Sequence, residues 1–308
     1  MATQNAIGTQ KPIEVANGGT GASTLTDHGV LVGSGAGAVT PLTVGASGEL
    51  LVGATTSDPA FATSADGNFT FTSATAATNR TLTVNNTDNT DTGSSATVQL
   101  TSGGTSAGDV AVKFTVTGTN YYSMGIDNSD SDKLKISNST SLGTTDSWTM
   151  TTAGERTMPL QPAFLAYLSA TASDVTGDGT SYTIVFNTEV FDQSDDYNNS
   201  TGIFTASVTG RYFLSAVVQL VGDVSGGTES FGTIVTSNRL YYFSFNPTLR
   251  RLAGYYGANN CITYSAAVVV DMDASDTAKI QMFCQNGSKV NDIYGGEAYT
   301  YFSGYLAV

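Results

Sequence analysis

Charged side chains are scarce in this chain: only 12% of its 308 residues are Asp, Glu, Lys or Arg. That is about half the share usual for a soluble globular protein. Pro occurs 6 times, Trp and His once each, and Gly 34 times, while Ser, Thr and Asn recur throughout. These small polar residues are poor in helix interiors and favour turns or strands. No apolar stripe recurs at helical spacing, so the sequence predicts an all-β protein.

The net charge of −14 is spread evenly, because residues 1–157 and 158–308 each hold 13 acids and 6 bases. An acidic chain without basic clusters argues against binding to nucleic acid or to an anionic membrane surface. No stretch reaches the roughly 18 apolar residues that span a bilayer. The N-terminus lacks the pattern of a secretory signal, so we expect synthesis and assembly in a cytoplasm.

Cysteine is also rare, with Cys261 and Cys284 as its two occurrences. Two cysteines do not form a disulfide scaffold, and assembly in a cytoplasm would leave them reduced. We expect buried thiols. A bridge formed after release is the alternative if the two residues lie on facing sheets.

Aromatic residues are unevenly distributed along the chain. Thirteen of the 15 Tyr and ten of the 14 Phe follow residue 158. Because large aromatics fill the core of a compact domain, the first half is predicted to need partner chains or to stay extended.

Residues 1–63 contain a repeat with a period of about twenty residues. Val30-Leu-Val-Gly33 returns as Leu50-Leu-Val-Gly53, and a Pro follows each copy at positions 41 and 59. Short strands in stacked units fit this spacing. The Gly-rich segment 16–24 resembles an element of bacteriophage tail-fibre proteins, and this resemblance implies a virion-attachment region that also begins a shaft. A phosphate-binding loop is disfavoured because the Lys-Ser/Thr ending is missing.

Residues 64–157 alternate between apolar and polar positions in several short runs. The runs at 68–72, 80–84, 97–100, 110–116 and 124–136 predict strands with one apolar face. The stretch also resembles the shafts of phage tail fibres. Three chains wound together would bury these single apolar faces, so we predict a trimeric β shaft.

Residues 158–308 carry an ordered series of strand motifs. These include Ala163-Phe-Leu-Ala-Tyr-Leu168, Ser181-Tyr-Thr-Ile-Val-Phe-Asn187, Tyr197-Asn-Asn-Ser-Thr-Gly-Ile-Phe204, Gly210-Arg-Tyr-Phe213 and Phe302-Ser-Gly-Tyr-Leu306. Their order resembles that of C1q/TNF-like domains. The resemblance implies a jelly-roll head that assembles as a homotrimer and binds a partner without catalysing a reaction. The three tyrosines at the C-terminal end, Tyr299, Tyr301 and Tyr305, are expected to pack in the core or at the trimer axis.

Catalytic constellations are weak in this sequence. His28 has only Asp27 nearby to orient it, which disfavours a catalytic triad. Acidic groups at 192, 195 and 196, at 271, 273 and 276, and at 223 and 229 could serve glycoside hydrolysis. However, Asp is common in turns because it accepts hydrogen bonds from local backbone N–H groups. Trp148 is the only Trp, so an aromatic-walled sugar cleft is not indicated, and a glycan depolymerase is the less favoured alternative.

Calcium is a possible cofactor. Asp174 and Asp178 lie in the Gly-containing loop 173–180, which partly matches an acidic calcium loop but lacks the further ligands of an EF-hand. Some C1q-like trimers hold calcium, so the resemblance favours this assignment.

Two loops have the composition of a recognition surface, in which Tyr supplies rigid contact area and Asn and Arg supply hydrogen bonds. They span 246–260 and 286–296, and ordinary exposed loops or intersubunit contacts are the alternative. The candidate receptor-binding residues are Arg250, Arg251, Tyr255, Tyr256, Asn259, Asn260, Lys289, Asn291 and Tyr294.

These features together predict a homotrimeric phage fibre or tail-tip adhesin. Its N-terminus would join other tail or baseplate proteins of the virion, and its head would bind a glycan or outer-membrane protein of a bacterium. A purely structural virion fibre whose head registers the trimer is the main alternative.

Overall fold

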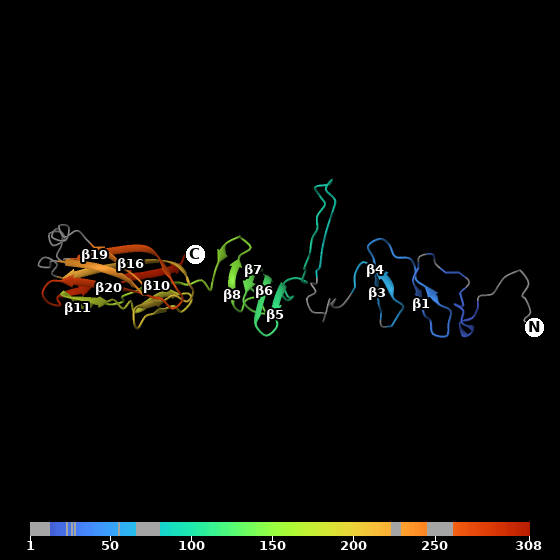
Figure 1. Ribbon diagram of the computed structural model, residues 1–308, viewed down its shortest axis with the longest axis horizontal. Coiled ribbons are helices and arrows are strands. Elements are labelled where there is room, and N and C mark those ends of the chain that lie inside the picture. Colours follow the sequence, from blue (N-terminus) through green and yellow to red (C-terminus); the bar gives the residue numbers. More distant parts are fainter. Residues whose placement is uncertain are drawn as a thin grey trace, which may run out of the picture. The chain divides into compact units, whose positions relative to one another are not determined.

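The computed structural model describes residues 13–22, 24, 25, 27, 29–54, 56–65, 81–222, 229–244 and 261–308. Its contacts divide the chain into two units, Met1–Ala96 and Thr97–Val308. Apart from one 3-10 turn, η1 (Val15–Asn17), the regular elements of these described residues are all β-strands (Figure 1). The predicted all-β class is therefore confirmed. The described residues contain no helix long and apolar enough to cross a membrane.

In the first unit, the two copies of the sequence repeat form the same local structure. Strand β1 (Leu31–Val32) pairs antiparallel with β2 (Thr40–Pro41), and β3 (Leu50–Val52) pairs antiparallel with β4 (Ala60–Ala62). Each copy is thus a short two-stranded hairpin. Such a hairpin is marginal on its own in water.

The second unit begins with a five-stranded antiparallel sheet. Its order is β5 (Val110–Val116), β6 (Asn120–Asp127), β7 (Lys133–Ser137), β8 (Asp146–Met150) and β9 (Arg156–Thr157). The alternation at 110–116 and at the end of 124–136 predicted strands correctly. The predictions at 81–84 and 97–100 were wrong, because those residues have no strand in the structure. The remaining predicted run, 68–72, and Arg80 lie outside the described residues.

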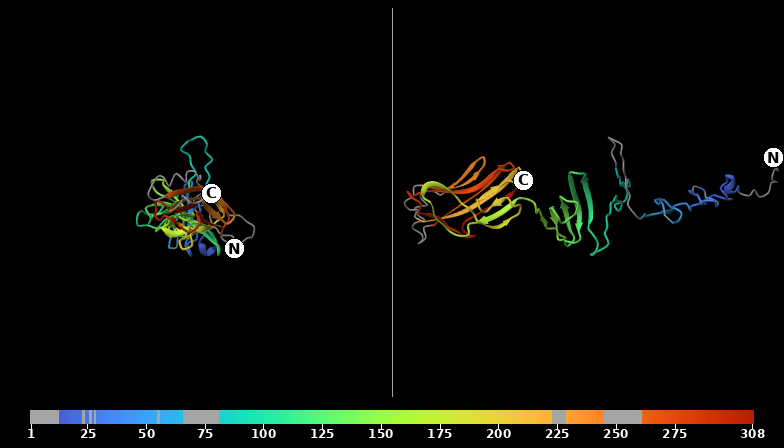
Figure 2. Two further views of the ribbon diagram at one scale, coloured as in Figure 1. Left: turned by 90° about the vertical axis from the view of Figure 1, so that its left-hand side faces the viewer. Right: turned by 90° about the horizontal axis from the view of Figure 1, so that it is seen from below.

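From Ala163 onward the chain forms a sandwich of two sheets, which Figure 2 shows from two further directions. The seven-stranded sheet contains β13 (Thr188–Asp192), β10 (Ala163–Tyr167), β22 (Tyr301–Leu306), β16 (Gly210–Gly222), β19 (Cys261–Met272), β21 (Asn291–Ile293) and β11 (Ala172–Thr176). The six-stranded sheet contains β14 (Tyr197–Asn198), β15 (Ile203–Thr205), β20 (Thr277–Gln285), β17 (Glu229–Thr236), β18 (Leu240–Ser244) and β12 (Asp178–Thr183). The strands expected near 163–168, 212–221, 240–245, 261–270 and 279–283 are all present, although Phe245 lies outside the described residues.

The core lies between these two sheets because each long strand alternates strictly. In β16, Tyr212, Leu214, Ala216, Val218 and Leu220 are fully buried, and the residues between them face away from the core. Strand β20 does the same from the opposite sheet with Ala278, Ile280, Met282 and Cys284.

Stacked aromatic rings join the two layers. The ring of Phe164, on the seven-stranded sheet, lies 4.8 Å from Phe204 and 5.0 Å from Tyr197, both on the six-stranded sheet. Phe302 meets Phe164 edge-on at 4.9 Å. Gly304 allows this packing, because a Cβ there would lie 2.8 Å from the Phe164 ring. The sequence motifs thus supply the centre of the core.

The C-terminal tyrosines correct one expectation. Phe302 and Gly304 of β22 point inward, whereas Tyr305 is 48% exposed on the outward face and contacts Phe213 with ring centroids 5.2 Å apart. Tyr299 is also exposed. Of the two places expected for these residues, Tyr299 and Tyr305 do not occupy the core of the single chain, since strand alternation turns Tyr305 outward. Their position at the trimer axis stays a prediction.

Candidate functional site

One end of the sandwich carries the turn at 286–290 and the two strand ends that flank the segment 246–260. Val221 pairs with Cys261, Gly222 pairs with Asn291, and Gln285 pairs with both Glu229 and Asp178. Strands β11, β16, β18 and β20 therefore all end on this side of the sandwich, which we call the distal end. The chain enters the sandwich at the opposite end of β16, where Arg211 N donates to the carbonyl of Val308 at 2.9 Å.

The turn after β20 is held against two glycines. Gly177 has a φ of 126°, and a Cβ at this position would lie 2.2 Å from the carbonyl oxygen of Ser288. Gly222 has a φ of 119°, and a Cβ there would lie 2.7 Å from the carbonyl oxygen of Val290. Both the backbone conformation and the close approach require glycine. The turn at 286–290 is therefore fixed by backbone packing.

Lys289 and Asp178 form an ion pair at the distal end. The Lys289 ammonium lies 4.0 Å from Asp178 Oδ2, and both side chains are partly exposed. Asp178 Oδ1 also accepts hydrogen bonds from the Thr180 hydroxyl at 2.6 Å and the Thr180 amide at 3.1 Å. These bonds, led by that of the hydroxyl, hold the pKa of Asp178 below its ordinary value, and the nearby Lys289 charge adds to the effect.

Asn291 and Tyr294, two other candidate residues, lie in different surroundings. The Asn291 side chain is fully buried, and its Oδ1 lies 3.4 Å from Cys284 Sγ, so Asn291 supports the turn from below. Tyr294 is 40% exposed and packs edge-on against Tyr299, with ring centroids 5.1 Å apart. Of these three residues, Lys289 and Tyr294 are exposed and Asn291 is buried.

The other candidate receptor-binding residues lie outside the described residues. These are Arg250, Arg251, Tyr255, Tyr256, Asn259 and Asn260. The strands that flank them end at Ser244 and begin at Cys261. Both of these strand ends are at the distal end.

The proposed calcium ligands are not surrounded by further acids. No group of three or more His, Cys, Asp or Glu side chains that could hold a metal occurs within the part of the chain that the structure describes. Asp178 is engaged by Thr180 and Lys289, and the amide of Asp174 donates to Asp292 Oδ1 at 2.8 Å. The two carboxylates alone fall short of the six to eight oxygens that calcium takes.

Two of the acidic groups considered for hydrolysis accept hydrogen bonds at turns. Asp192 accepts hydrogen bonds from the amides of Asp196 and Tyr197, and Asp276 accepts from Asn238 Nδ2 and the Asp273 amide. Burial raises the pKa of Asp196 above its ordinary value, against the hydrogen bond from Ser207. His28 and Asp223 lie outside the described residues.

The cysteines differ in their surroundings. Cys261 carries an exposed free thiol at the start of β19, whereas Cys284 is buried in the core. The expected buried thiol is found at Cys284 only, because Cys261 stands at an outward position of its strand.

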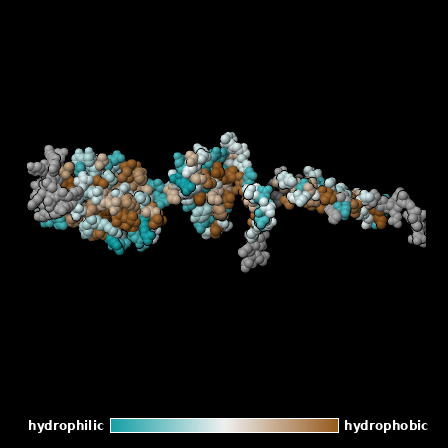
Figure 3. Space-filling model, turned by 90° about the horizontal axis from the view of Figure 1, so that it is seen from above, coloured by the Kyte–Doolittle hydropathy of each residue, from teal (hydrophilic) through white to brown (hydrophobic). Residues whose placement is uncertain are grey.

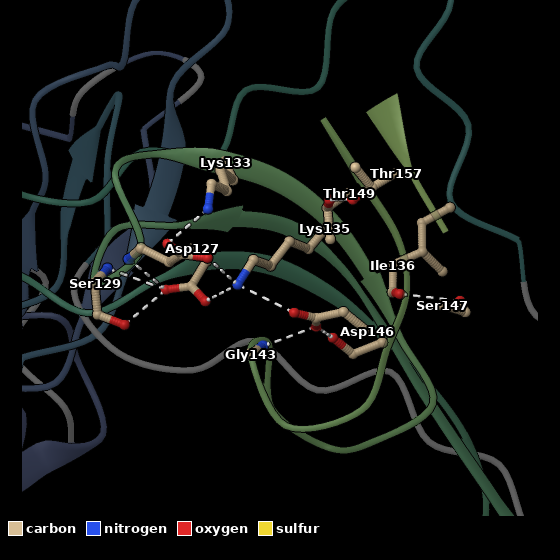
Figure 4. Close-up of polar contacts among 12 residues, drawn as sticks. Asp127, Ser129, Lys133, Lys135, Ile136, Gly143, Asp146, Ser147, Thr149 and Thr157 are labelled. Carbon is tan, nitrogen blue, oxygen red and sulfur yellow. Dashed lines mark hydrogen bonds and ion pairs between the residues drawn. The ribbon is translucent and has the colours of Figure 1, made fainter. Parts of the chain in front are cut away.

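The five-stranded sheet contains a charge cluster that the sequence analysis did not identify. Figure 4 shows the ammonium of Lys135 pointing between Asp127 and Asp146. It lies 2.9 Å from Asp127 Oδ2, 2.7 Å from Asp130 Oδ2 and 3.1 Å from Asp146 Oδ2. Lys135 and Asp127 are only 3% and 2% exposed. The sequence signal that could have predicted this cluster was a Lys at an inward-facing strand position, next to a turn rich in Asp.

Hydrogen bonds complete this cluster. Asp127 Oδ1 accepts from the Ser129 amide, the Ser129 hydroxyl and the Asp130 amide at 2.7–3.1 Å. Burial acts to raise the pKa of Asp127, but the bonds from Lys135 and Ser129 outweigh it and the pKa is lowered. Burial likewise acts to lower the pKa of Lys135, and its three carboxylate partners raise it instead. The ion cluster is therefore charged at neutral pH, and it serves to hold the sheet together.

Comparisons with known proteins found solved structures that are similar to part of this chain. The globular domain of zebrafish complement 1qA protein is similar at 20% identity and a TM-score of 0.34, covering 48% of this chain and 98% of that chain. Murine APRIL in its crystal structure at pH 8.0 is similar at 12% identity and a TM-score of 0.33, covering 47% and 98%. No curated protein matches the chain.

The family model of the C1q domain matches residues 163–307. Domains of this kind in general mediate trimerisation and ligand binding and are not enzymes. The matched residues are those that form the two-layered sandwich and its aromatic core. Residues 163–307 therefore form a C1q/TNF-like domain.

Proposed function

We propose that the protein is a homotrimeric bacteriophage fibre or tail-tip adhesin whose C1q/TNF-like domain binds a glycan or an outer-membrane protein of a bacterium. Under this proposal residues 1–63 attach to other virion proteins, 64–157 form the shaft, and 158–308 form the head. The observation that carries the proposal is the distal end of the sandwich, where four strands end and the exposed Lys289 lies.

The position of the distal end suits receptor binding. Strand β16 runs for 13 residues between the two ends of the sandwich. At about 3.3 Å per residue, the distal end lies roughly 40 Å from the point where the chain enters. A surface at that distance from the point where the chain enters the sandwich can meet a cell while the remainder stays attached to a particle.

The outward face of the seven-stranded sheet supports the homotrimer. Its central rows, read across the paired strands β19, β16, β22 and β10, are Val269–Phe213–Tyr305–Ala163, Ala267–Ser215–Ser303–Leu165 and Ser265–Val217–Tyr301–Tyr167. None of these side chains is charged. Uncharged, partly aromatic surface is typical of the core of a subunit interface.

Three copies of the head would also give the adhesin its affinity. When sites are joined in one assembly, binding at the second and third sites becomes intramolecular, which raises the overall affinity by about 10²–10⁴ without new contacts. The individual sites can then be weak and still hold a particle on a cell.

A structural fibre without a receptor is the second candidate, favoured by the same uncharged sheet face. In that role the head would only register three chains. Truncation before residue 158 separates the two functions: a registration role predicts failed assembly, and a receptor role predicts assembled particles that do not adsorb.

The decisive experiment measures binding of fluorescently labelled full-length protein to a panel of bacteria. A triple variant, Lys289→Glu, Arg250→Glu and Arg251→Glu, reverses the charge of the candidate loops. Lys279→Glu is the matched control, because this Lys pairs with Ile203 and Val235 far from the distal end.

Saturable binding by the wild type and by Lys279→Glu, with loss in the triple variant, would support the adhesin. Light scattering and thermal melting would verify that each variant is assembled and folded. Absence of wild-type binding to every strain, including the host of the parent particle, would refute the receptor role and favour the structural one.

A further inference from the structure

The five-stranded sheet exposes its apolar face and buries its polar face, which is the reverse of the arrangement in a normal single-chain domain. Its pairing creates apolar rows that cross the strands: Val110–Ile126–Leu134–Met150, Val112–Met124–Ile136–Trp148 and Phe114–Tyr122, extended along β5 by Val116. Residues paired across antiparallel strands lie on the same face. We call these eleven residues the apolar face.

The apolar face is open to solvent in the single chain. Phe114 is 55% exposed, Val116 63%, Tyr122 44%, Met124 43% and Val112 40%. Figure 3 shows brown, hydrophobic residues at the surface over the segment of strands β5–β9. A monomer rarely leaves so large a contiguous apolar surface uncovered.

The opposite face is the one that the chain covers by itself. It carries the buried cluster of Lys135, Asp127 and Asp146, and Ser123 and Ser137 are fully buried beside it. The turns between the strands complete this polar network with hydrogen bonds. The Gly143 amide, for example, donates to Asp146 Oδ1 at 2.9 Å (Figure 4). The partner surface of this sheet is therefore the apolar face.

We propose that the apolar face packs against the same face of two further copies of this chain, so that three sheets enclose one shared hydrophobic core. The inference rests on the homotrimer of the proposed function. None of the eleven side chains is charged, so identical faces can meet without repulsion or buried unpaired charge.

The connection to the head favours further copies over any other occupant. Only residues 158–162 separate β9 from β10, and they can span at most roughly 18 Å. Gln193 Nε2 donates to the carbonyls of Met158 and Gln161 at 2.7 Å, and Gln161 Nε2 donates to the carbonyl of Leu306 at 2.8 Å. This connection is thus pinned to the head.

In a homotrimeric head, three such sheets would be tethered close together. Short tethers give effective concentrations in the millimolar range. A foreign protein would have to compete with that concentration for the apolar face, which is why we assign the face to this chain's own copies.

Trp148 offers a direct test, because it is the only Trp and lies on the apolar face. Acrylamide quenching of Trp148 is measured in the full chain, in Phe114→Asp and in Thr115→Asp. The two substitutions lie side by side on β5, but Thr115 faces the other side of the sheet. We expect quenching to rise roughly twofold in Phe114→Asp, as a half-exposed indole loses its cover, and to stay at the wild-type level in Thr115→Asp.

Cysteine crosslinking provides a second readout that does not depend on a destabilising charge. In a Cys261→Ser background, Phe114→Cys should form disulfide-linked species on oxidation, and Thr115→Cys should not. Equal quenching in the two Asp variants together with equal crosslinking in the two Cys variants would overturn the inference.

Light scattering distinguishes failure of this inference from failure of the homotrimer. A monomeric full chain would refute both. A trimeric chain whose Trp148 is as accessible as a free indole would refute only the assignment of the apolar face.

Discussion

Replacing Lys135 with Met should destabilise the five-stranded sheet and reverse its response to acid. The substitution keeps a linear apolar side chain and removes the ammonium that lies 2.9 Å from Asp127 Oδ2 and 3.1 Å from Asp146 Oδ2. Asp127 is 2% exposed. Removing one partner of a buried ion pair costs about 3–5 kcal/mol, because the other charge stays buried without compensation. We expect a loss of stability of that size at pH 7.

The sign of the pH dependence follows from the pKa of Asp127. In the wild type this pKa is lowered in the folded state, so the stabilisation is present above the unfolded value of about 3.9 and is lost as pH falls through the folded value. Without Lys135, burial dominates and raises the pKa of the carboxyl. The folded variant then takes up a proton more readily than the unfolded chain, so stability should increase between pH 7 and pH 5.

Denaturant unfolding followed by Trp148 fluorescence measures this, because Trp148 in β8 pairs directly with Ile136, the neighbour of Lys135. Lys133→Met is the matched control. Lys133 lies 2.9 Å from Asp130 in a pair whose side chains are 32% and 41% exposed, and surface pairs of this kind contribute little. The reasoning would be refuted if both Met variants lost the same stability, or if Lys135→Met kept the wild-type response to acid.

Two further predictions concern the head. Phe164→Ala removes a ring that is 1% exposed and contacts three other rings. It should lower the free energy of unfolding by about 3–5 kcal/mol and the melting temperature of the head by roughly 10 °C, as measured by calorimetry. An unchanged melting temperature would contradict the assignment of this ring to the core. Gly177→Ala should displace the turn at 286–290, because its Cβ would meet the Ser288 carbonyl at 2.2 Å, and hydrogen exchange of that turn should accelerate. Gly287→Ala is the control, since Gly287 also has a positive φ but no atom within 4 Å of the added Cβ; equal exchange in the two variants would argue against a turn held by close packing.

The fold of the head could be predicted because the motifs that identify it are also its core. The motifs contain four aromatic residues that lie far apart in the sequence and meet between the two sheets in the structure: Tyr197, Phe204, Tyr212 and Phe302. Strand alternation with period two then assigns every other residue of β16 and β20 to the interior. The residues that identify the fold in the sequence are therefore the same residues that pack in its core.

The candidate binding surface could be predicted only in part. Composition identified Lys289, but it could not separate that exposed residue from the buried Asn291 two positions later. The difference in exposure between these two residues depends on the close approach of the turn to Gly177 and Gly222. These glycines precede Lys289 by 112 and 67 positions in the chain. Long-range backbone packing of this kind leaves no local pattern.

The two uncharged sheet faces explain why charged residues are scarce in this chain. The three central outward rows of the seven-stranded sheet and the apolar face of the five-stranded sheet contain no charged residue, although both face solvent in the single chain. In the head, Asp192 and Asp276 instead accept hydrogen bonds from backbone amides at turns. In the trimer that we propose, the uncharged faces would be buried and the acidic turns would remain outside. The net charge of −14 would then act between assembled particles, keeping them apart, and not across the interfaces that join the chains.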